Sequence, residues 1–155
     1  VENSHAIADP QRTLAQNLAD WGADLIIGTH PHVLQNAQWL TAADGRQVFT
    51  AYSLGNFIST QEKPDQLIGA ILSVQLEKTT ELDGTVRCSV LSPRLLPTVT
   101  HYDAGKSNVR TYLFRDYTEA LTKAHGVRQA YPDFSLEMIQ SIARENIDPE
   151  LLQLT

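Results

Sequence analysis

Hydrophobic residues recur at helical spacing across residues 9–22, and an apolar run at 24–27 follows at once. Asp9 can cap such a helix, and Pro10 suits its first turn. The predicted apolar face consists of Leu14, Leu18 and Trp21. The run at 24–27 is apolar on both faces, which is typical of a strand buried within a sheet. A helix that leads directly into a buried strand is half of a βαβ unit, so we predict an α/β fold.

Alternating patterns further along the chain predict antiparallel strands. Residues 36–54 form a hairpin pattern around Asp44-Gly45, and Gly55-Asn56 predicts a tight turn after it. Residues 67–76 and 86–90 alternate on either side of Asp83-Gly84, as expected for an antiparallel pair with one buried face. The proline-punctuated stretch with Leu95, Leu96 and Val99 is interpreted as an edge strand or an extended crossing.

The chain changes character at about residue 103, and we divide it there into residues 1–102 and 103–155. The second part is predicted as a loop at 103–107 followed by helices that cover the sheet. One helix runs from Tyr117 to His125 with Asp116 as its cap, a second starts after Ser135, and a short third opens at Asp148-Pro149. A partner-binding tail is the alternative to a packed cover.

The main candidate chemistry is a pair of histidines, His30 and His32, which follow the 24–27 run and Gly28. Ligands of α/β proteins gather beyond the carboxyl ends of strands, where this pair is expected. Neutral imidazole is the commonest metal-binding side chain. Pro31 favours an extended His30, and an extended H-x-H sequence projects both rings to one side. A pair of metal ligands and an ordinary turn both remain open from spacing alone.

Other reactive residues are interpreted as ordinary structure. His5, His101 and His125 lack ligand spacing to another histidine, and His125 is placed in a last helical turn, where an imidazolium is favoured. Cys88 is expected as a small core residue, and a single cysteine excludes an internal disulfide. The acidic residues near 77–83 are expected at a solvated hairpin end. No nucleophile elbow and no phosphate-binding glycine loop occurs.

Composition narrows the class of protein. The 155 residues are 42% hydrophobic and 19% charged, as in globular domains, with a formal net charge of −6. The acidic balance, with a pI of about 5.2, argues against a nucleic-acid partner. No apolar run approaches the roughly 20 residues that span a bilayer, and residues 1–20 do not form a secretory signal.

Two blocks resemble signature motifs of one family. Gly28-Thr29-His30-Pro31-His32-Val33-Leu34-Gln35 and Tyr52-Ser53-Leu54-Gly55-Asn56-Phe57-Ile58 are similar to blocks of the bacterial capsule-synthesis CapA family, also called the poly-γ-glutamate synthesis family. The resemblance covers roughly residues 1–100. Family members often carry His at the position of Thr29, a departure that leaves the histidine pair intact.

The resemblance implies a fold and a site. The family's domain resembles the calcineurin-like metallophosphoesterases, so the chain is expected to be the carboxyl-terminal portion of such an α/β sandwich, with a small helical cover. His30 and His32 are the implied metal ligands, and Asn56 and Glu2 are implied to bind substrate. Asn56 could instead only form a chain reversal, and Glu2 could be a solvated terminal residue. The implied cofactors are divalent manganese, zinc or iron ions in the full-length parent. Further Asp, Asn and His ligands are expected upstream of Val1, which leaves an incomplete site here.

The resemblance also implies two alternative functions in capsule or poly-γ-glutamate biosynthesis. One is a metal-dependent hydrolase of phosphoester or amide-like groups, inactive as this chain alone. The other is a non-catalytic component that holds an anionic polymer. The expected partners are an anionic polymer or a small-molecule substrate, no nucleic acid, and a second copy through an exposed sheet edge at 24–27. The expected location of the parent is extracytoplasmic and membrane-associated.

Overall fold

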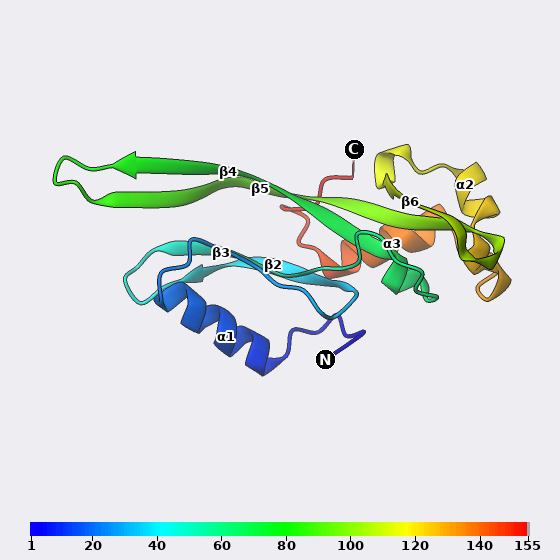
Figure 1. The fold of residues 1–155 in the computed structure, drawn as a ribbon, viewed down its shortest axis with the longest axis horizontal. Helices are drawn as coiled ribbons and strands as arrows, with labels where there is room; N and C mark the ends of the chain where they lie inside the picture. Colours follow the sequence, from blue (N-terminus) through cyan, green and yellow to red (C-terminus); the bar gives the residue numbers. More distant parts are fainter. Residues whose placement is uncertain (155) are drawn as a thin grey trace.

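The computed structural model describes residues 1–154 and contains two three-stranded sheets that lie one above the other (Figure 1). In chain order, the helices and strands are α1 (Asp9–Asp20), β1 (Leu25–Ile27), β2 (Leu34–Thr41), β3 (Gln47–Leu54), η1 (Pro64–Leu67), β4 (Ile68–Thr80), β5 (Val86–Asp103), η2 (Ala104–Lys106), β6 (Ser107–Leu113), η3 (Phe114–Asp116), α2 (Glu119–Ala124), η4 (Gly126–Gln129) and α3 (Leu136–Asn146).

The first sheet has the strand order β1-β3-β2 and mixes parallel and antiparallel pairing. β1 runs parallel to β3, with Leu25 opposite Phe49, whereas β2 and β3 form the predicted antiparallel hairpin. Gly55 follows with a φ of 66°, which confirms the predicted tight turn. A helix, α1, feeding a strand that pairs in parallel confirms the α/β class.

The second sheet has the order β4-β5-β6 and is antiparallel throughout. β5 is its central strand, so the expectation that residues 95–99 form an edge is wrong. Pro97 is tolerated because β6 reaches only as far as the residue after it, where Thr98 pairs with Leu113. The missing N–H of Pro97 therefore breaks no bond to β6.

The main core lies between the two sheets and extends under the carboxyl-terminal helices. Its fully buried large side chains include Leu34 and Phe49 from the first sheet, Ile68 and Leu95 from the second, and Ile139 from α3. Each of these side chains contributes on the order of 1.5–3 kcal/mol when it is removed from water. The two sheets are thus held together by one apolar layer.

Helix α1 covers the opposite face of the first sheet (Figure 1), and its packing corrects our prediction. It buries Ala15 and Ala19, while Leu14 and Trp21 are 55% and 76% exposed. The expected apolar face is therefore wrong for Leu14 and Trp21, whereas Leu18 is half-buried. The small side chains of Ala15 and Ala19 let the helix backbone lie close to the sheet. The helix is also capped one residue earlier than predicted, with the Ala8 N–H donating to Oε1 of Gln11 at 3.0 Å.

The distal parts of β4 and β5 project from the body as a two-stranded arm (Figure 1). Residues 75–89 are all exposed, which includes Cys88. The expectation that Cys88 belongs to a core is wrong, because this part of β5 is exposed. The acidic residues near 77–83 are solvated, as predicted. The alternating pattern thus identified the strands but not where the covering layer ends.

The carboxyl-terminal part contains a strand as well as helices. β6 was not predicted. It pairs with the end of β5, which lies on the other side of the predicted boundary at residue 102, so residues 103–155 are not a purely helical extension. Helix α2 is capped by the Thr118 hydroxyl rather than by Asp116, and α3 is capped by Ser135 as predicted. Asp148-Pro149 forms one turn and no helix. The division of the chain at residue 102 stays a prediction.

A buried histidine pair fastens this cover to the second sheet. Nε2 of His125 lies 3.0 Å from the Thr100 carbonyl oxygen, while its Nδ1 accepts from the Val127 N–H. Nδ1 of His101 lies 2.7 Å from the Tyr117 hydroxyl. Burial lowers the pKa of His125 to about 4 and also lowers that of His101. The interpretation of His125 as an imidazolium at a helix end is therefore wrong.

We predict that Gly28→Ala weakens the β1–β3 contact. The Gly28 N–H donates to the Ala51 carbonyl at 2.7 Å, and a Cβ at Gly28 would clash with the Tyr52 carbonyl oxygen. The backbone must shift, so the free energy of unfolding in urea should fall by about 2 kcal/mol. Ser89→Ala is the control, because it changes an exposed side chain on the two-stranded arm. Equal losses in both variants would contradict crowding at Gly28.

We predict that stability falls as the pH drops from about 6.5 towards 4. In this range His125 is protonated in the unfolded chain but not in the folded chain. The contribution of His125 to the free energy of unfolding is therefore fully present above pH 6.5 and is lost as the pH falls below it. The loss from this residue is at most about 3 kcal/mol. Urea unfolding at several pH values measures the slope. His125→Gln should flatten it and His30→Gln, at an exposed site, should not; equal slopes in the two variants would contradict the assignment.

Candidate functional site

The candidate site lies where two parallel strands end. β1 ends at Ile27 and β3 at Leu54, and because the strands are parallel their carboxyl ends meet at one edge of the sheet. His30 and His32 follow β1, and Asn56 follows β3. This is the placement that we predicted for the histidine pair, and it matches the usual position of ligand sites in α/β sheets.

The backbone of the histidine turn is not extended. His30 has a φ of 100° and His32 a φ of 62°, so the expectation of an extended H-x-H segment is wrong. Pro31 between them is buried, and its carbonyl oxygen accepts a hydrogen bond from the Asn3 N–H at 2.7 Å. Non-glycine residues with positive φ cost about 1–2 kcal/mol each, and such residues cluster at functional sites.

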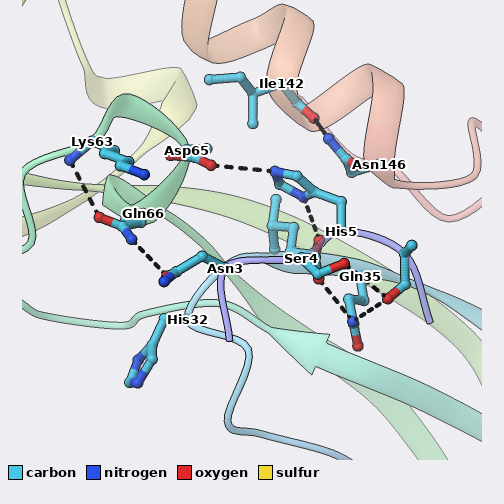
Figure 2. A network of polar contacts seen from close by, with 12 residues as sticks. Asn3, Ser4, His5, His32, Gln35, Lys63, Asp65, Gln66, Ile142 and Asn146 are labelled. Atoms are coloured by element: carbon cyan, nitrogen blue, oxygen red, sulfur yellow. Dashed lines mark hydrogen bonds and ion pairs between the residues drawn. The ribbon is translucent and has the colours of Figure 1, made fainter. Parts of the chain in front are cut away.

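The two imidazole rings are neighbours with different environments. Their centroids lie 6.4 Å apart with an angle of 45° between the ring planes. His30 is exposed, and His32 is half-buried. Figure 2 shows the His32 ring pointing away from the polar network that surrounds Asn3 and Gln66. The pair therefore consists of one exposed ring, that of His30, beside the half-buried ring of His32.

Asn56 determines which nitrogen of His32 carries the proton. The Asn56 amide nitrogen donates to the His32 carbonyl oxygen at 3.1 Å and to the Gln66 carbonyl oxygen at 2.9 Å. Its Oδ1 must then be the atom that faces Nδ1 of His32, at 3.0 Å. An amide oxygen only accepts, so Nδ1 of His32 is the donor, and in the neutral ring Nε2 keeps its lone pair. This tautomer leaves Nε2 able to bind a metal ion.

This contact gives Asn56 an observed structural role. Its amide is used by His32 and by two backbone carbonyls, so contact with substrate stays a prediction. Glu2 is exposed and directly precedes Asn3, whose N–H is bonded to Pro31. Among residues 1–154 no ion pair to Glu2 occurs. Its assignment to substrate binding also stays a prediction, although the backbone brings it beside the histidine turn.

A network of amides and carbonyls holds the amino-terminal residues against the site (Figure 2). The Gln66 side chain donates to Oδ1 of Asn3 at 2.6 Å, and the Gln35 side chain donates to the carbonyls of Ser4 and Ala6 at 2.9 and 3.0 Å. Nδ1 of His5 lies 2.7 Å from the Leu34 carbonyl oxygen. Both glutamines are buried. Sequence reasoning missed them, because neither glutamine carries a local signal beyond the position of Gln35 at the end of the first motif.

The described residues do not complete a metal centre. Within residues 1–154, no group of three or more His, Cys, Asp or Glu residues is placed to hold an ion. Catalytic zinc sites use about three protein ligands and structural sites four. The histidine pair therefore provides part of a ligand set.

Comparisons with known proteins agree with the position of these motifs. The family described as bacterial capsule synthesis protein PGA_cap matches residues 1–61. The chain is 39% identical over 82 residues to the PGA biosynthesis protein CapA of Bacillus subtilis (strain 168), a match that covers 53% of this chain and 19% of that protein. It is 45% identical over 51 residues to the capsule biosynthesis protein CapA of Bacillus anthracis, covering 33% of this chain and 11% of that protein. No solved structure matches.

The matched region contains the histidine turn, Asn56 and the strands that bring them together. It spans 19% or less of the length of these curated relatives. Over this region, the chain is similar to the bacterial capsule synthesis family and to the two CapA proteins.

Proposed function

We propose that the His30–His32 turn supplies part of a divalent-metal centre in a capsule-biosynthesis protein. The observation that carries this proposal is the contact between Nδ1 of His32 and Oδ1 of Asn56, which leaves Nε2 free to bind a metal ion. The positive φ angles of both histidines support it, since strain of this kind needs surrounding structure to hold it.

The residues of this chain have definite tasks in such a centre. His32 would bind through Nε2, Asn56 would orient its ring, and His30 would add a second imidazole from the same turn. Manganese, zinc or iron would suit imidazole nitrogen. When bound, such an ion polarises a phosphoryl or carbonyl oxygen and lowers the pKa of bound water. Because two imidazoles are an incomplete ligand set, we expect the chain alone not to hydrolyse phosphoesters.

A non-catalytic role is the second candidate, in which the domain holds an anionic polymer. The observation that favours it is a polar cleft with two lysines near Gln66, separate from the histidine turn. The partner in both cases would be an anionic polymer or a small substrate. We also propose an extracytoplasmic, membrane-associated parent. No helix within residues 1–154 has the length and apolar character to cross a bilayer.

We predict that His32 is protonated on Nδ1 and binds zinc weakly through Nε2. Long-range ¹H–¹⁵N spectra of the imidazoles report the tautomer, and a zinc titration should shift the Nε2 resonance of His32. Replacing both His30 and His32 by alanine should abolish binding. Asn56→Ala should weaken binding roughly tenfold or more, because the ring loses the group that orients it.

His5→Gln is the matched control, because His5 lies outside the turn and bonds to Leu34. It should leave zinc binding unchanged. A proton on Nε2 of His32, or zinc affinity retained in the double alanine variant, would contradict the proposed centre.

We predict that the chain self-associates through the free edge of β1. β1 lies at one end of the first sheet, and Ile27 is 51% exposed. An unpaired apolar edge can pair with a second chain. Ile27→Lys should therefore shift the sedimentation profile towards monomer. Ile71→Lys on β4, another edge strand, is the control. A wild-type chain that is already monomeric at high concentration would contradict the prediction.

A further inference from the structure

A polar cleft lies between the loop that joins the two sheets and the carboxyl-terminal cover. Its cavity of about 570 Å³ is lined by Ser59, Thr60, Lys63, Gln66, Lys106 and Tyr131, among others. A second cavity of about 340 Å³ adjoins it and shares three of its lining residues, which are Glu62, Lys106 and Ala130. The two cavities are therefore lobes of one groove.

An ion pair lies at the junction of the two lobes. Nζ of Lys106, at the end of η2, lies 2.6 Å from Oε1 of Glu62, in the loop on the other side. Both residues line both lobes. The hydrogen bond from Lys106 lowers the pKa of the Glu62 carboxyl. This pair, which we call the latch, divides the groove.

The two segments that contain Glu62 and Lys106 are fixed by backbone geometry and hydrogen bonds. The Tyr102 hydroxyl donates to the Gln61 carbonyl at 3.2 Å, next to Glu62. Lys106 has a φ of 57° and follows Gly105 with a φ of 70°, in a tight turn between β5 and β6. The Gln66 side chain is buried at the floor and accepts from the Lys63 N–H. The groove is thus built before any ligand arrives.

The lining points to the chemistry of the ligand. Lys63 has no ion-pair partner within residues 1–154, and Lys106 has only the latch. The remaining polar groups include hydroxyls at Ser59 and Thr60 and amides at Gln61 and Gln129, which can donate to and accept from peptide groups. With a net charge of −6, the chain must attract an anion locally rather than through its overall field.

We infer that this groove binds a carboxylate-bearing peptide-type chain, and that a ligand carboxylate replaces Glu62 on Lys106. The inference rests on the proposed role in the synthesis of an anionic polymer. Both partners of the latch are substantially exposed, and exposed ion pairs contribute little stability, so the exchange costs little. Once the latch opens, the two lobes form one continuous groove with Lys63 in one lobe and Lys106 at the junction.

Calorimetry with hexaglutamate tests the inference, with hexaglutamine as the uncharged probe of equal length. Hexaglutamate should bind and hexaglutamine should not. Lys63→Ala and Lys106→Ala should each lower the affinity up to roughly fivefold, and Glu62→Gln should raise it roughly two- to fivefold by freeing Lys106. Lys78→Ala is the matched control, because it removes one lysine from the exposed arm.

Comparing Glu62→Gln with Glu77→Gln, which removes one carboxylate from the exposed arm, distinguishes a latch from general charge attraction, because only Glu62→Gln should raise the affinity. Weaker or unchanged binding in Glu62→Gln would overturn the latch, and equal losses in Lys78→Ala and Lys106→Ala would overturn the site. Binding of oligogalacturonate as tight as that of hexaglutamate would overturn the peptide-type ligand. The double alanine variant of His30 and His32 should bind hexaglutamate normally, so failure of the metal centre and failure of the groove are separate results.

Discussion

The parallel pairing of β1 with β3 is the contact on which the candidate site depends. It is short, with only Leu25–Ile27 in register, and it continues through the Gly28 N–H to the Ala51 carbonyl. Gly28 has no side chain, and a Cβ there would meet the Tyr52 carbonyl. This close approach brings the residues after β1 beside those after β3. Without this contact, the histidine turn and Asn56 would not be held next to each other.

Asn56, which follows β3, then fixes the orientation of the His32 ring. Its amide joins the His32 backbone, the His32 ring and the Gln66 backbone, so three segments are fixed by one side chain. Gln66 continues the connection to Asn3, which is bonded to Pro31 inside the turn. The cost of two positive φ angles at histidine is offset by this network. A turn held from several sides can keep a conformation that an isolated peptide would avoid.

The carboxyl-terminal part depends on a different kind of contact. Neutral His125 and His101 join the cover to β5 within an aromatic cluster, and α3 adds its apolar face to the core between the sheets. The cover in turn forms one wall of the groove that contains the Glu62–Lys106 pair. The histidine turn lies at strand ends, whereas the groove lies between a loop and the cover. Two separate surfaces therefore have features suited to ligands.

The sequence by itself determined the α/β class, the two hairpins, the Ser135 cap and the placement of His30 and His32 after a strand, because local periodicity and turn chemistry act over a few residues. It wrongly predicted that strand as buried, because β1 lies at the edge of its sheet and Ile27 is 51% exposed. It misplaced the exposed Leu14, Trp21 and Cys88, because burial depends on which element covers a face and where that cover ends. It missed β6, the positive φ angles of the histidine turn and the contacts of Gln66. Only the tertiary structure decided these, since each one depends on partners distant in the chain, such as Asn3 with Gln66 and Lys106 with Glu62.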